Sequence, residues 1–278
     1  MTVPGSSVGG IIIAPKGRIA FDLADLWHFR ELLYFLVWRE IRVRYKQTVL
    51  GAAWAILQPL ATTLVFTAVF SVFAKIPSDG YPYPVFAYAA LLPWTYFAQA
   101  LTRSTASLVG DANLIRKVYF PRLVIPLSAV ISAALDFAVS FGVFLGLMTY
   151  FGVHPTWRLL TLFALLPFVA LTALAVGLWL SVLNVRYRDI GHTIPFIVQL
   201  WMYASPIAYP LSLVPAGWRL LYSINPIVGV SEAFRWALLG QSELDVTPIL
   251  LALAVVAVLL AGGLAFFKRW EPLFADVI

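Results

Sequence analysis

The sequence predicts an all-α polytopic membrane protein with six transmembrane helices and both termini in the cytoplasm. Hydrophobic residues make up 62% of the 278 residues and the mean hydropathy is +0.89. Only 12% of residues are charged, where a soluble domain carries about 25%. All but four of the 19 lysines and arginines fall in segments that this topology places on one side of the membrane, which is the positive-inside bias of cytoplasmic loops.

The same bias accounts for the net charge of +6, so we expect no nucleic-acid partner. The sequence contains no cysteine, which excludes a disulfide framework and a thiolate metal site. Residues 1–20 are expected to form a flexible cytoplasmic tail, because their short apolar run precedes the basic residues instead of following them as in a signal peptide. Residues 21–278 are expected to form a single transmembrane domain.

Residues 22–37 come before the first predicted span and have the pattern of an amphipathic helix. Asp22 can cap its start, Leu26 and Val37 lie near one side, and His28 and Glu31 lie near another. This pattern is typical of a helix that lies on the inner membrane surface. The spacing also fits a helix that only anchors the chain at the interface.

The first span follows a cluster of four cations, Arg39, Arg42, Arg44 and Lys46, which marks its cytoplasmic end. No charge occurs from there to Ala74, and about 20 apolar residues are enough to cross the ~30 Å hydrocarbon core. We therefore expect this span at about 50–74. The other spans are expected at about 84–107, 122–151, 158–184, 191–214 and 247–267.

No catalytic constellation or nucleotide site is evident in the sequence. The three histidines are far apart, and no glycine-rich loop ends in a Lys-Ser/Thr pair, so we expect a non-catalytic chain without a cofactor of its own. Asp136 is the clear ionisable residue inside a predicted span, which makes it a functional candidate. A carboxylate that is hydrogen-bonded inside the bundle, or protonated, is the alternative.

Aromatic residues are plentiful, at 15%. Rings stack on the apolar faces of sugars, so deep aromatic side chains could line a translocation path. The candidates are Phe66, Phe70, Phe73, Trp94, Tyr96, Phe97, Trp201 and Tyr203. The first three, spaced i, i+4, i+7, would form one helical stripe. Ordinary packing in the bundle and against lipid is the alternative.

Five segments occur in an order and at spacings that match one family. They are RVRYKQTVLGAAWAILQP, NLIRKVYFPRLVIPLS, LNVRYRDI, SPIAYP and INPIVGVSEAFRWALLG. Together they resemble the membrane permease subunits of ABC transporters that export polysaccharides, such as O-antigen, capsule or teichoic acid. The resemblance covers nearly the whole chain after about residue 22.

This resemblance implies a type-2 ABC exporter permease fold in a bacterial cytoplasmic (inner) membrane. It implies a homodimer in which each copy pairs with a separate ATPase subunit, and that subunit would hold ATP and Mg. The implied substrate is a lipid-linked glycan that enters from the inner leaflet.

The resemblance also assigns residues to roles. The coupling helix that contacts the ATPase would be 113–121, namely Asn113, Leu114, Ile115, Arg116, Lys117, Val118, Tyr119, Phe120 and Pro121. The helix 22–37 would be the interface helix, with Asp25, Leu26, His28, Arg30 and Glu31. Outer re-entrant helices would occupy 215–246 and carry an outer gate of Glu232 and Arg235. An exposed ion pair, worth about 0–1 kcal/mol, is the alternative for these two.

Other functions remain open from the sequence. A drug or small-lipid exporter would share the same fold. A membrane enzyme acting on lipid-linked sugars would need clustered carboxylates or histidines at one membrane face, and the acidic residues here are scattered. A secondary carrier would need inverted repeats and several mid-span charges, neither of which the sequence shows.

Overall fold

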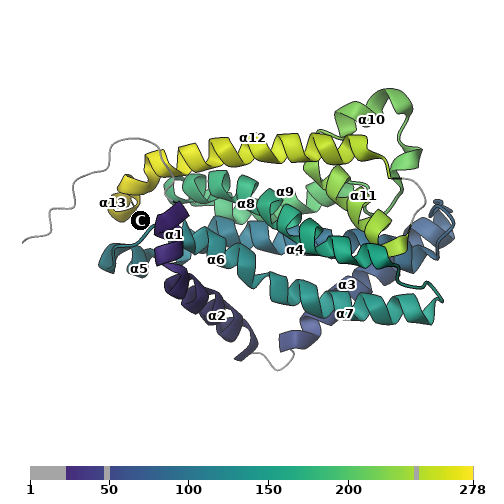
Figure 1. The fold of residues 1–278 in the computed structure, drawn as a ribbon, viewed down its shortest axis with the longest axis horizontal. Helices are drawn as coiled ribbons and strands as arrows, with labels where there is room; N and C mark the ends of the chain where they lie inside the picture. Colours follow the sequence, from purple (N-terminus) through teal and green to yellow (C-terminus); the bar gives the residue numbers. More distant parts are fainter. Residues whose placement is uncertain (1–22, 47–50, 241–243, 278) are drawn as a thin grey trace, which may run out of the picture.

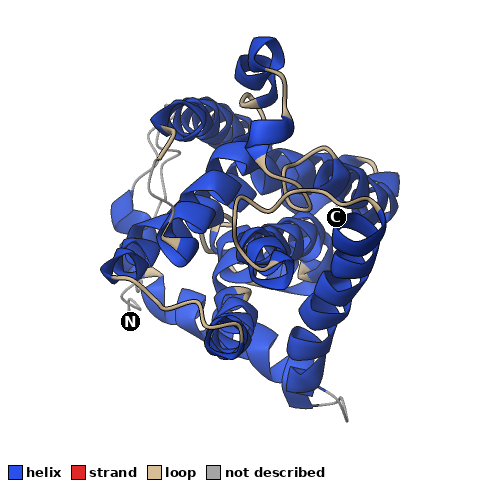
Figure 2. Cartoon of the chain, turned by 90° about the vertical axis from the view of Figure 1, so that its right-hand side faces the viewer, coloured by secondary structure: helices blue, strands red, loops and turns tan. Residues whose placement is uncertain are grey.

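The computed structural model describes residues 23–46, 51–240 and 244–277, and every regular element within these ranges is a helix (Figures 1 and 2). The elements in chain order are α1 (Leu23–His28), α2 (Arg30–Lys46), α3 (Gly51–Phe66), the π-helix η1 (Thr67–Phe73), α4 (Tyr83–Gly110), α5 (Ala112–Lys117), α6 (Val124–Ser132), α7 (Ala134–Tyr150), the 3₁₀-helix η2 (Trp157–Thr161), α8 (Leu162–Arg186), α9 (Asp189–Tyr203), η3 (Leu211–Leu213), α10 (Ala216–Tyr222), α11 (Pro226–Leu239), α12 (Val246–Trp270), η4 (Glu271–Leu273) and α13 (Phe274–Val277). The predicted tail 1–20, the cap residue Asp22 and residues 47–50 lie outside the described residues.

Among the described residues, four helical stretches are long and apolar enough to cross a membrane. They are Ile56–Phe73, Val124–Tyr150, Trp157–Arg186 and Val246–Leu273. They coincide with four of the six predicted spans, so the prediction of an all-α multi-pass membrane protein is confirmed. The other two predicted spans correspond to α4 and α9, which are helical but do not belong to this group.

The helix α4 runs through the centre of the bundle (Figure 1) and packs against α3, α6, α7, α8 and α11. Most of its side chains are buried against these neighbours. Because its surface meets protein, it accommodates polar residues such as Gln99 and Arg103 that lipid would not favour. Those residues lower its hydropathy relative to the helices at the periphery.

The expected aromatic stripe on the first span does not form. The α-helical hydrogen bonding of α3 changes at Thr67 into the wider turns of η1, which shifts the register of the residues that follow. Phe66 is consequently buried, Phe70 is half-buried and Phe73 is 79% exposed. Phe66 and Phe70 still meet edge-on, with ring centroids 5.4 Å apart.

Two predicted boundaries are wrong. The helix expected at 22–37 is interrupted after α1, and α2 continues to Lys46, because arginine and lysine are good helix formers and stabilise the C-terminal end of the helix dipole. The basic cluster is therefore part of a helix. The helix of the fifth predicted span, 191–214, ends at Tyr203, before Pro206, which restricts the backbone of the residue preceding it.

The helices α10 and α11 lie at the end of the bundle opposite α5 and α13 (Figure 1). Asn225 caps α11, since its side-chain oxygen accepts from the backbone N–H of Ile227 at 3.1 Å, and Pro226 occupies the first helical position. Gly240 ends the helix with φ of 72°, a left-handed conformation that suits glycine. The structure therefore has two short helices inside the predicted 215–246 segment.

Candidate functional site

The loop 112–121, which contains α5, combines buried anchors with an exposed ridge. Ile115 and Phe120 are buried, and Ile115 lies on the short helix α5. Arg116, Lys117 and Val118 are exposed between them, and the next residue, Tyr119, is 75% exposed. The two buried side chains fix the loop to the bundle, so its cationic and apolar ridge is held outward. The other predicted members of this segment are Asn113 (exposed), Leu114 and Pro121 (both half-buried).

Two polar contacts hold the ends of this loop. At its start, Arg39 of α2 donates to the Asp111 carboxylate at 2.6 Å, and this hydrogen bond raises the pKa of Arg39. At its end, the backbone N–H of Arg122 donates to Glu271 at 2.9 Å. The loop is therefore tied both to the N-terminal helix α2 and to the segment that follows α12.

The predicted interface-helix residues lie on α1 and the start of α2. Leu26 is half-buried, and His28, Arg30 and Glu31 are exposed, while the side chain of Asp25 lies outside the described residues. Arg30 donates to the backbone oxygen of Trp27 at 3.2 Å and lies over its ring. These residues present a mixed polar and aromatic surface next to the loop-bearing end of the bundle (Figure 1).

Asp136 is buried at the start of α7 and is hydrogen-bonded inside the bundle, which is the alternative to a functional role given above. Arg44 and Tyr45 from α2 both donate to its carboxylate, and Arg103 from α4 donates at 2.9 Å. Burial, followed by the hydrogen bond to Asp136, raises the pKa of Tyr45 to about 12, so the phenol stays protonated and donates. We refer to Arg44, Tyr45, Arg103 and Asp136 as the Asp136 cluster. It joins α2, α4 and α7.

Arg44, Tyr45 and Arg103 are not among the residues that the sequence predicts as partners of Asp136. The available signal is that Arg44 and Arg103 lie near ends of predicted spans, while Asp136 is the clear acidic residue inside one. However, Arg44 is separated from Asp136 by 92 residues, and no sequence pattern joins them. The two guanidinium groups compensate the charge of the buried Asp136 carboxylate. The main role of the cluster is therefore to link α2, α4 and α7.

The predicted gate pair, Glu232 and Arg235, is not the exposed ion pair that the spacing allowed. Arg235 is only 1% exposed, and its guanidinium lies 3.9 Å from the centroid of the Phe86 ring. It donates to Glu232 at 3.3 Å and to the backbone oxygen of Ile207 at 2.9 Å. A further contact reaches the oxygen of Tyr209 at 3.4 Å. The pair therefore fixes the loop 204–210 onto α11 and α4.

The eight predicted path aromatics fall into two groups. Phe66, Trp94, Tyr96 and Phe97 are buried, so within one chain they are packing residues and not free to line a path between two copies. Phe97, for example, meets Trp201 edge-on with centroids 5.2 Å apart. Phe73 and Tyr203 are exposed, and Phe70 and Trp201 are half-buried. Only this second group remains available for the predicted role.

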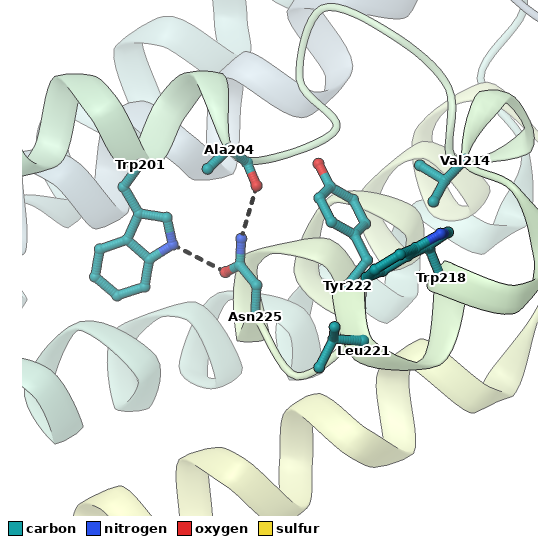
Figure 3. Close-up of a pocket in the computed structure, with 7 residues that line it drawn as sticks. All are labelled: Trp201, Ala204, Val214, Trp218, Leu221, Tyr222 and Asn225. Carbon is teal, nitrogen blue, oxygen red and sulfur yellow. Dashed lines mark hydrogen bonds between the residues drawn. The ribbon is translucent and has the colours of Figure 1, made fainter.

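A pocket of about 440 Å³ lies between α9 and α10 (Figure 3). Its lining residues are Trp201, Ala204, Val214, Trp218, Leu221, Tyr222 and Asn225. Asn225 organises one wall: it accepts from the Trp201 indole N–H at 2.9 Å and donates to the backbone oxygen of Ala204 at 3.2 Å. It also donates to the Ser205 hydroxyl at 2.9 Å. Asn225 is not among the predicted site residues, although an Asn-Pro pair before an apolar run is a recognisable helix start.

Comparisons with known proteins agree with these observations. A family model described as ABC-2 type transporter matches residues 31–239. The "O-antigen export system permease protein RfbA" of Myxococcus xanthus is 31% identical over 257 residues, covering 91% of this chain and 98% of that protein. A protein of the same name from Klebsiella pneumoniae is 26% identical over 258 residues, covering 91% and 97%. The "Polysialic acid transport protein KpsM" of Escherichia coli is 26% identical over 247 residues, covering 86% and 93%.

Proposed function

This chain belongs to the ABC-2 type transporter family, and on that basis we propose that it is the transmembrane permease subunit of an ABC transporter that exports a lipid-linked polysaccharide, such as O-antigen. The observation that carries the proposal is similarity along nearly the full length to proteins named for O-antigen export and polysialic acid transport. A short shared motif would not carry the same weight.

In this proposal the chain crosses the bacterial inner membrane six times, and α4 and α9 supply the two spans beyond the four apolar stretches. An even number of spans puts both termini on the same side of the membrane, and the positive-inside bias makes that side the cytoplasm. The helices α10 and α11 would re-enter the membrane from the outer side. The burial of α11 against α4, α8 and α12 supports that assignment.

The transporter would be a homodimer of this chain with two ATPase subunits, and ATP and Mg would be bound there. This chain itself would be non-catalytic. The exposed ridge Arg116–Tyr119 would enter the ATPase, because charges around apolar anchors are typical of protein interfaces. The surface of α1 and α2 would lie beside it as the interface helix.

The glycan would pass between the two copies, and the aromatics that are not buried within one chain would face that path. Phe70, Phe73, Trp201 and Tyr203 are the candidates that remain. Stacking on such rings is adaptable and worth about 0.5–1.5 kcal/mol per contact, so it can hold a sugar polymer without trapping it.

The test is complementation of a strain that lacks this gene. We expect loss of the surface polysaccharide and accumulation of its lipid-linked form inside the cell, and the wild-type gene should restore export. Arg116→Glu combined with Lys117→Glu should insert normally but fail to restore export, because reversed charges change partner choice at an interface. Arg116→Lys combined with Lys117→Arg preserves the charge and should restore it.

Unchanged surface polysaccharide in the deletion strain would contradict the proposed substrate class. If the strain instead became sensitive to drugs or altered in its lipids, the chain would be a permease of the same fold with a smaller substrate.

A further inference from the structure

A pair of hydrogen bonds fastens the end of the loop 112–121 to the end of α12. The backbone N–H of Arg122 donates to Oε1 of Glu271 at 2.9 Å, and the Nη1 of Arg122 donates to the backbone oxygen of Glu271 at 3.0 Å. Glu271 directly follows the last residue of α12. Two segments that are 149 residues apart are thus joined through both backbone and side-chain atoms.

Apolar contacts reinforce this joint. Phe274 in α13 is buried and meets Phe267 of α12 edge-on, with ring centroids 5.2 Å apart. The short helix α13 also packs against α5. The loop that carries α5 is therefore supported by the C-terminal segment 271–277 in addition to its covalent connections to α4 and α6.

The opposite end of α12 is tightly seated against α11. A Cβ atom added at Gly229 of α11 would lie 2.4 Å from the backbone oxygen of Pro248 and 2.7 Å from the Cβ of Ala252. The two helices approach as closely as the missing side chain allows, so one cannot shift far without the other. Figure 1 shows α12 extending from α13 at one end of the molecule to the neighbourhood of α11 at the other.

We propose that Glu271 is a positioning residue that transmits movement of α5 to α12, and through the Gly229 contact to the outer helix α11. This inference rests on the proposed function, in which the loop 112–121 contacts the ATPase. The loop is covalently joined only to α4 and α6. Its joint with Glu271 adds a direct connection to α12, the helix that reaches the residues around Glu232 and Arg235.

The first experiment measures the joint itself. The permease–ATPase complex would be prepared in lipid nanodiscs with Glu271→Ala, Glu271→Gln or the control Val277→Ala, which alters an exposed side chain in the same segment. Amide hydrogen exchange at Arg122 should become about tenfold faster or more in Glu271→Ala, because a charge-assisted hydrogen bond is lost. Glu271→Gln keeps an acceptor oxygen and should restore most of the protection.

The second experiment measures transmission to the outer end. Gly217→Cys in α10 gives a single thiol in a chain without cysteine, and a Cβ there meets nothing within 4 Å. Three residues join α10 to α11, so we expect its labelling rate by an impermeant thiol reagent to differ between nucleotide-free and ATP-bound complexes. That difference should disappear in Glu271→Ala and persist in Glu271→Gln and Val277→Ala. If Glu271 only stabilised the fold, Glu271→Ala would lower the protein yield, and the folded protein would keep the same nucleotide-dependent labelling as Glu271→Gln and Val277→Ala.

The inference is overturned if Glu271→Ala keeps the nucleotide-dependent labelling, or if the parent protein shows no such dependence. The charge reversal at Arg116 and Lys117 distinguishes a failure of the proposed ATPase contact from a failure of the proposed role of Glu271. If that reversal leaves ATPase assembly and export intact, the proposed contact of the loop 112–121 is wrong. If the reversal uncouples the complex while Glu271→Ala does not, only the role of Glu271 is wrong.

Discussion

The loop 112–122 and the segment 204–240 lie at opposite ends of the bundle, and they place their arginines in opposite environments (Figure 1). Arg116 projects from the loop 112–122 and is exposed, whereas Arg235 is buried in the segment 204–240 and donates to Glu232 and Ile207 of its own chain. The loop 112–122 therefore presents charge on its surface. The segment 204–240 uses the same chemistry to hold its own backbone in place.

The largest expected effect on stability comes from removing the buried arginine, Arg235. Arg235→Ala leaves Glu232 without its cation and Ile207 without a donor, so we expect a loss of about 3–5 kcal/mol in the free energy of unfolding. Arg116→Ala, at an exposed position, should change it by no more than about 0.5 kcal/mol. Thermal denaturation in detergent, together with the yield of folded protein, would measure both. Equal stability of the two variants would remove the contrast between the two ends.

A second pair of variants tests the difference between the buried and the exposed aromatic residues. Phe97 is fully buried, so Phe97→Ala should cost about 3–5 kcal/mol through the cavity it creates. Phe73 is exposed in the single chain, so Phe73→Ala should leave the stability of the monomer within about 0.5 kcal/mol. If Phe73 faces the translocation path, the same variant should slow export in cells. Normal export with Phe73→Ala would assign this ring to contact with lipid.

The smallest expected effect concerns the Asp136 cluster. Tyr45→Phe removes one of the donors to Asp136 while both arginines remain, so we expect a loss of about 1 kcal/mol. The folded pKa of about 12 lies above the ordinary value of 10.0, so this contribution is constant below pH 10 and falls as the pH rises toward 12. Denaturation of both proteins at pH 6 and pH 9 should give the same difference. A difference that changes between these pH values would show that Tyr45 ionises in that range.

Much of the fold follows from the sequence because lipid imposes a simple rule. Membrane-spanning helices such as α8 and α12 are continuously apolar, and their predicted ranges agree with the structure to within a few residues. The end of α9 was missed because its apolar composition continues to Val214, and hydropathy does not register the backbone restriction at Pro206. The length of α2 does not follow from the sequence pattern, because a basic cluster before an apolar run is typical of a membrane flank as well as of a helix end.

Side-chain environments were harder to predict than the helices. The spacing of Glu232 and Arg235 is the same whether the pair is exposed or buried, and only the surrounding helices decide between the two. The partners of Asp136 are distant in the sequence, so their convergence depends on how α2 crosses α4 and α7. The buried anchors Ile115 and Phe120 lie in a segment that the resemblance identified, but their burial is a property of the packing.

The π-helix in the first span makes ring orientation depend on how tightly the backbone winds. In a regular α-helix the seven steps from Phe66 to Phe73 would turn the chain by about 700°, which brings Phe73 back to the side of Phe66. The wider turns of η1 rotate the chain less per residue, so Phe66 is buried and Phe73 is exposed. The direction in which Phe73 points is therefore set by the winding of the backbone, and a substitution that restored regular α-helix could redirect the ring without any change in its chemistry.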